Sequence, residues 1–82
     1  MKMNNDSRTN EEHFKRKAEI FYQNLWIAHI ETQDGTFYNG RILNIFDSYL
    51  ELHDRVIGRV KILYVDITKF VEYIPKEKEV GE

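Results

Sequence analysis

An Asp-Gly step between two runs of alternating residues constrains this chain more than any other feature. Asp34 and Gly35 follow a run of period two, residues 25–32, in which Trp26, Ala28 and Ile30 occupy one side. An Asp-Gly pair between such runs is the strongest short-range signal for a β-hairpin, because its turn needs positive φ angles. We therefore predict a strand over residues 25–32 and a second strand over residues 36–46.

The second predicted strand contains a glycine and a break in its alternation. Gly40 lies inside the run, where a glycine marks a sharp bend and a Cβ would press into a neighbouring strand. The alternation then slips, because four apolar side chains cannot share one face: Ile42, Leu43, Ile45 and Phe46. A β-bulge near residues 43–44 resolves this conflict.

Three further short runs complete a β-rich pattern. We predict strands over residues 49–55, 59–65 and 69–74, with Leu50 and Leu52 inward and Pro75 ending the last strand. Five short, strongly bent strands are typical of a small all-β barrel.

A helix is expected before the strands. Thr9 and Glu12 form a capping-box pattern. An apolar stripe then recurs at helical spacing, at Phe14, Ala18, Phe21 and Leu25. We predict a helix over residues 9–24, preceded by a flexible arm (1–8), and a charged flexible tail over residues 76–82.

Length and composition allow one small domain, expected over residues 9–75 with the barrel over 25–75. A core within 82 residues often needs a partner for stability. No apolar run has membrane-spanning length, and the polar residues 1–10 lack the apolar segment of a secretory signal, so we expect a cytoplasmic protein without a membrane partner. The net charge of −2 counts against nucleic-acid binding by bulk electrostatics.

The chain contains residue types that occur in active sites, such as histidine, but not at the spacings that active-site motifs require. The chain has no cysteine, and His13, His29 and His53 fall on three different predicted elements. No histidine pair has the spacing of a metal site, and no glycine-rich phosphate loop exists. We therefore expect no enzyme activity, metal, cofactor or small-molecule substrate.

The centre of the chain resembles the first motif of the Sm-like family (Sm, LSm and Hfq proteins). In that motif a strand ends in Asp-Gly, an aromatic residue lies two positions before a buried glycine, and an Asp opens the next loop. Here these positions are Asp34-Gly35, Tyr38, Gly40 and Asp47. The resemblance covers residues 14–74 and implies an N-terminal helix, a five-stranded bent barrel, a ring-shaped oligomer and an RNA ligand. Another small SH3-like barrel would satisfy the same strand pattern.

The resemblance also implies an RNA-binding pocket, which this chain keeps in part. The family's base-stacking residue lies two positions after the Asp, and here it is Tyr49. The Asn that hydrogen-bonds uracil lies two further on, where this chain has Glu51. An ionised Glu donates no hydrogen bond and repels phosphates. Tyr49 is therefore either a stacking platform or an ordinary exposed strand residue.

The family's second motif, Ile-Arg-Gly, is replaced. Tyr64 and Val65 take the Arg and Gly positions, and Val65-Asp66 does not supply the Lys-His pair of Hfq. We expect Tyr64 in the core and no preference for uridine. The helix residues Lys15, Arg16 and Lys17 are ordinarily a solvated face, but repeated around a ring they would build a basic surface for RNA.

The fourth and fifth predicted strands present apolar edges with little protection. Such edges favour pairing between subunits, which in the family joins the fourth strand to the fifth strand of a neighbour. The sequence therefore predicts a cyclic homo-oligomer that binds single-stranded RNA through an atypical pocket. The alternatives are a structural or protein-interaction oligomer without RNA, and an accessory domain of a larger complex.

Overall fold

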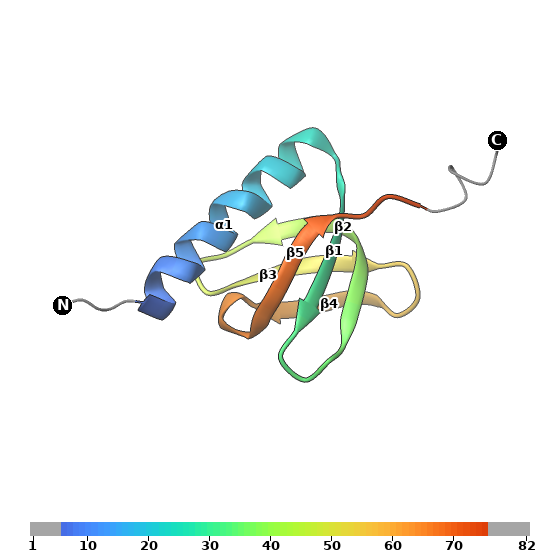
Figure 1. Ribbon diagram of the computed structural model, residues 1–82. Coiled ribbons are helices and arrows are strands. Elements are labelled where there is room, and N and C mark those ends of the chain that lie inside the picture. The colour runs from blue at the N-terminus through green and yellow to red at the C-terminus, as the bar shows by residue number, and fades with distance from the viewer. Residues whose placement is uncertain (1–5, 76–82) are drawn as a thin grey trace.

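The computed structural model describes residues 6–75, with side chains from residue 10 onward (Figure 1). One helix is followed by five strands, and a 3-10 turn separates the last two strands. The predicted tail over residues 76–82 and the first five residues of the predicted arm lie outside the described residues.

Helix α1 spans Asp6–Asn24, so it begins three residues before the predicted N-cap. The placement of Thr9 as N-cap was therefore wrong, and residues 6–8 belong to the helix rather than to an arm. Asp6 and Ser7 are themselves residue types that favour a helix start, and they precede Thr9 in the chain. The same stretch thus offers an earlier starting point than the capping box.

The apolar stripe of α1 packs against the sheet, as predicted, through Ala18 and Phe21, which are buried, and Phe14, which is partly buried. The rings of Phe14 and Phe21 lie 6.1 and 4.9 Å from the ring of Phe70 on the last strand, measured between centroids. Burial of these apolar surfaces stabilises the contact between helix and sheet.

Leu25 was predicted to continue this stripe, and that prediction was wrong. The helix ends at Asn24, and Leu25 has a φ of 58° and is 66% exposed. The amides of Leu25 and Trp26 donate to the carbonyls of Tyr22 and Phe21, as in a Schellman ending. This left-handed ending turns the chain from the helix directly into the first strand.

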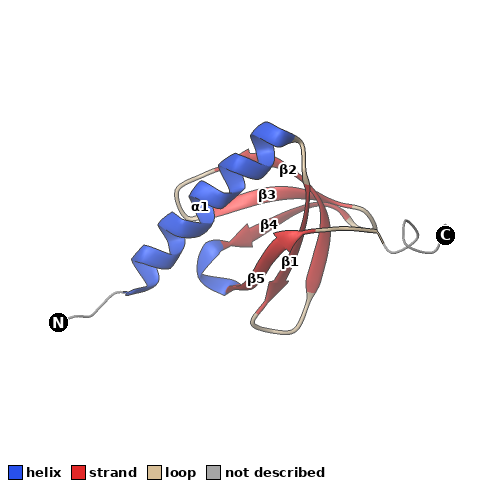
Figure 2. Cartoon of the chain, turned by 45° about the horizontal axis from the view of Figure 1, so that its top comes forward, coloured by secondary structure: helices blue, strands red, loops and turns tan. Residues whose placement is uncertain are grey.

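The five strands form one antiparallel sheet. They are β1 (Ile27–Thr32), β2 (Phe37–Ile45), β3 (Tyr49–Asp54), β4 (Gly58–Leu63) and β5 (Ile67–Glu72), in the spatial order β4-β3-β2-β1-β5. Figure 2 shows α1 lying across the strands. Within residues 6–75, β4 and β5 are the two edges and do not pair with each other, so the sheet is open.

The last two strands differ from their predicted bounds. β4 ends at Leu63 rather than residue 65, because η1 (Tyr64–Asp66) forms a 3-10 turn, the short blue coil before β5 in Figure 2. The backbone amide of Gln33 donates to the carbonyl of Asp66, and its side chain donates to the carbonyl of Val65. These contacts tie η1 to the β1–β2 turn, and β5 begins directly after η1, at Ile67, two residues earlier than predicted.

The close approach of a neighbouring strand at Gly40 and the bulge in β2 are both confirmed. A Cβ at Gly40 would overlap the backbone carbonyl of His53 on β3, so the two strands meet closely at this point. The pairing of β2 with β3 shifts register between Ile42 and Asn44, which leaves Leu43 in a bulge.

The core lies between the inner face of the sheet and α1. Leu50, Leu52 and Tyr64 are fully buried, as the sequence predicts. The Tyr64 hydroxyl donates to the carbonyl of Phe46 over 2.7 Å, and burial raises the pKa of Tyr64 to about 12. Tyr64 is therefore a neutral core residue that joins η1 to the loop after β2.

Candidate functional site

Tyr49 lies half-buried at the start of β3, where a neighbouring ring and a cation accompany it. Its ring stacks on Phe46 with the centroids 4.7 Å apart and the planes 25° from parallel. The ammonium group of Lys61, on the adjacent strand β4, lies 4.5 Å from the Tyr49 centroid. Two stacked aromatic rings with a cation over one of them have the composition of a base-stacking platform.

Glu51 points to the same outer face of the sheet but already has partners. Its carboxylate accepts hydrogen bonds from Asn44 on β2 and Arg59 on β4, each over 2.8 Å, and its side chain is 22% exposed. These partners hold the acid in place across three strands. A base edge would have to displace one of them to reach Glu51.

Asp47 lies in the loop between β2 and β3 and is 98% exposed. Its carboxylate accepts a hydrogen bond from the Lys15 ammonium over 2.7 Å. This pair lowers the pKa of Asp47 and raises that of Lys15. The contact joins α1 to the loop before Tyr49, although exposed ion pairs of this kind add little stability.

The three basic residues predicted on the helix have different surroundings. Lys15 is paired with Asp47, the Lys17 ammonium lies 5.5 Å from the ring centroid of Phe70, and Arg16 is exposed. Arg16 therefore offers a cation to solvent, whereas Lys15 is partly neutralised within the chain.

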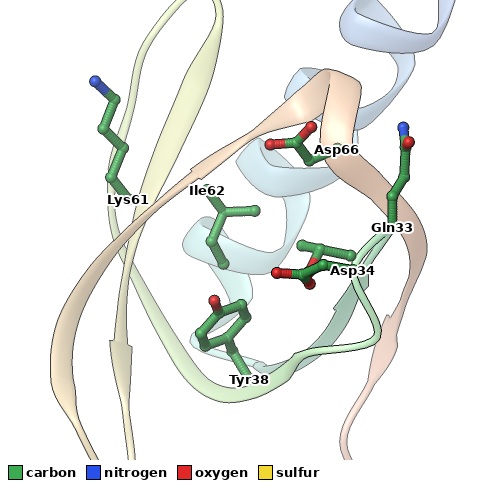
Figure 3. A pocket seen from close by; sticks show the side chains of 7 residues that line it. Gln33, Asp34, Tyr38, Lys61, Ile62 and Asp66 are labelled. Carbon is green, nitrogen blue, oxygen red and sulfur yellow. The ribbon is translucent and has the colours of Figure 1, made fainter.

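A separate hollow opens between the β1–β2 turn and β4 (Figure 3). It has a volume of about 220 Å³ and is lined by Thr32, Gln33, Asp34, Tyr38, Lys61, Ile62 and Asp66. The Lys61 side chain extends away from the hollow in this view, while two carboxylates border it. Negative charge without a facing cation makes this hollow unsuited to phosphate.

The carboxylate of Asp34 in this hollow also has a structural role. It accepts hydrogen bonds from the Thr32 hydroxyl and the Thr36 amide, over 2.7 and 3.0 Å, and these bonds lower the pKa of Asp34. Asp34 thus closes the predicted hairpin turn. The sequence did not indicate the hollow, because Asp34 and Asp66 are neighbours through the fold alone.

Two other types of site receive no support from the part of the chain that is described. No group of three His, Cys, Asp or Glu side chains within residues 6–75 is placed to hold a metal ion. Over the same residues, no helix combines the length and hydrophobicity needed to cross a membrane.

Sequence reasoning missed the residues that surround Tyr49 and Glu51. Phe46, Lys61 and Arg59 come from neighbouring segments, and the positions of the two cations follow from the register: Glu51 lies opposite Lys61, and Tyr49 lies opposite Leu63. Directly opposite and diagonal neighbours across strands are within reach of long side chains. Pairing the predicted strands residue by residue would have found this cluster.

Comparison with known protein families gives no matching family, and no curated protein matches the sequence.

Proposed function

We propose that this chain is an Sm-like ring protein that binds single-stranded RNA. The sheet order supports assembly, since β4 and β5 lie at opposite edges and are unpaired within the described residues. Leu63 on β4 and Val71 on β5 are large, apolar and exposed. In the proposed ring, β4 of one subunit pairs with β5 of the next and completes a barrel-like wall.

The cluster at Tyr49 carries the proposal of RNA binding. A base would stack on the paired Phe46 and Tyr49 rings, and Lys61, which lies over the Tyr49 ring, would move aside to contact the adjacent phosphate. Glu51 is held by Asn44 and Arg59 and donates no hydrogen bond to uracil. Uridine is therefore not preferred over other bases.

The test measures binding of labelled U-rich, A-rich and mixed RNA oligonucleotides at low and moderate salt. Tyr49→Ala should weaken binding of every oligonucleotide by roughly 1–3 kcal/mol, with little change in the salt dependence. Tyr22→Ala is the matched control, because Tyr22 is an exposed tyrosine on α1. A second variant, in which Gln replaces Lys15, Arg16 and Lys17, tests whether the helix contacts RNA phosphates. If it does, the affinity of this variant for RNA should depend less steeply on salt concentration.

Two results would contradict this proposal. If Tyr49→Ala and Tyr22→Ala bind as the unaltered protein does, Tyr49 is not the platform. Tight binding of U-rich RNA alone would contradict the proposed lack of uridine preference.

A structural or protein-interaction homo-oligomer without RNA is the second candidate. The satisfied carboxylate of Glu51, the pairing of Lys15 with Asp47 and the net charge of −2 favour it. A stable oligomer that binds none of the oligonucleotides at low salt would establish this function instead.

A further inference from the structure

Three basic side chains form a row across the outer face of the sheet, at the far end of β3 from Tyr49. Arg41 on β2 pairs in register with His53 on β3, and His53 pairs with Arg59 on β4. All three residues are exposed. We call these residues the basic row.

The fold itself does not require this charge pattern. Arg59 has a partner in Glu51, but Arg41 forms no ion pair among the residues that the structure describes. Arg41 therefore presents a positive charge that the described part of the chain does not neutralise.

A shallow depression lies beside the basic row. It has a volume of about 550 Å³ and is lined by Ile27, Gly40, Arg41, Leu43, His53 and Arg55. These lining residues include no acidic side chain, in contrast to those of the hollow near Asp34.

We propose that the basic row and this depression bind the phosphate backbone of single-stranded RNA, as a second contact surface apart from Tyr49. This inference rests on the proposed function, because it takes RNA as the ligand. Arg is suited to the site, since its planar guanidinium binds phosphate through two parallel hydrogen bonds.

The dimensions of the sheet fit one strand of RNA that reaches both surfaces. Neighbouring strands are about 4.8 Å apart, so the basic row extends over about 10 Å. His53 lies four positions after Tyr49 on β3, which corresponds to about 13 Å. A base stacked on Tyr49 and phosphates at the row thus belong to the same short stretch of RNA.

The test compares the salt dependence of binding for variants of the full chain, with a mixed-sequence RNA oligonucleotide as probe. Arg41→Gln should weaken binding and reduce the slope of log affinity against log salt by about 0.7 for each phosphate that is no longer neutralised. His53→Gln combined with Arg41→Gln should weaken binding further. Arg41→Lys keeps the charge and should retain most of the slope.

Lys69→Gln is the matched control, because Lys69 is an exposed cation on β5, at the opposite edge of the sheet from β4. It should leave the slope unchanged. Light scattering on each variant verifies that the subunit count is the same as in the unaltered protein.

The outcomes separate this inference from the function on which it rests. If the unaltered protein binds RNA and Arg41→Gln has the same slope as Lys69→Gln, the basic row is not a phosphate site, while RNA binding stands. If the unaltered protein binds no RNA at low salt, the proposed function fails and the inference fails with it.

Discussion

Asp54 is the one charged side chain that is buried among the residues whose side chains are described, with 7% of its surface exposed. Its carboxylate accepts three backbone hydrogen bonds, from Val56 over 2.8 Å and from Ile57 and Asn39 over 3.0 Å. These bonds close the β3–β4 turn and attach it to β2. An Asp at a strand end commonly caps a turn in this way, whereas the bond to Asn39 depends on the pairing of β2 with β3.

We predict that Asp54→Ala lowers the free energy of unfolding by about 1–3 kcal/mol, because it leaves three backbone amides without their acceptor. Urea denaturation measures this change. Asp47→Ala is the matched control, since Asp47 is exposed and its carboxylate bonds to a side chain, that of Lys15, rather than to the backbone. Equal stability of the two variants would contradict the role of Asp54.

The same residue predicts a pH dependence. Desolvation raises the pKa of Asp54, but the bonds from Ile57, Val56 and Asn39 outweigh it and hold the pKa below the ordinary value of 3.8. Because the folded pKa is depressed, the stabilisation is fully present above about pH 3.8 and disappears as the pH falls through the folded pKa. Stability measured from roughly pH 5 down to roughly pH 2 should therefore fall more for the unaltered protein than for Asp54→Asn, whose side chain does not titrate. Parallel pH profiles of the two proteins would contradict this prediction.

At the scale of elements, β2 combines a close contact with β3 and a bulge. Gly40 permits close contact with β3, and the bulge at Leu43 follows within three residues. A side chain at position 40 has no room, because the atoms it meets belong to the backbone of His53 and Asp54. The strand is therefore specific for glycine at this position.

We predict that Gly40→Val destabilises the fold by about 3 kcal/mol or more, through overlap with the backbone of β3. Thermal melting, monitored by circular dichroism, measures this loss of stability. Arg41→Val is the control, since Arg41 is exposed and lies next to Gly40 on the same strand. Near-native melting of Gly40→Val would show that β2 and β3 are not in close contact there.

Elements with a local signal were predictable from the sequence. The Asp34-Gly35 turn, the close approach of β3 at Gly40 and the bulge near Leu43 each depend on a few adjacent residues, and all three are present. The left-handed Leu25 was not predictable, because a leucine rarely ends a helix in this way. η1 was missed because its contacts with Gln33 cross more than thirty positions of the chain.

In the candidate site, too, some features follow from local sequence and others depend on contacts between distant segments. The outward positions of Tyr49 and Glu51 follow from the period of two in β3, with Leu50 and Leu52 inward. Their partners on β2 and β4 depend on the strand register, and the bulge shifts that register by one residue. The basic row also depends on strand register, since strand pairing aligns Arg41, His53 and Arg59.

At the scale of the whole molecule, the open sheet leaves two edges that carry apolar side chains. An 82-residue chain with such edges gains stability and avoids aggregation when subunits pair them. We predict that Val71→Lys disrupts this assembly, because it places a charge on the outer edge strand β5. Gln23→Lys adds the same charge on the exposed surface of α1 and should leave assembly intact.

The central claim, that β4 and β5 join subunits into a closed ring, is tested most directly by the native mass in solution. Light scattering coupled to size-exclusion chromatography should give a single homo-oligomer whose subunit count does not change over the micromolar range. Val71→Lys should shift this species toward single chains, whereas Gln23→Lys should not. A well-behaved monomer of the unaltered protein at micromolar concentration would contradict the ring.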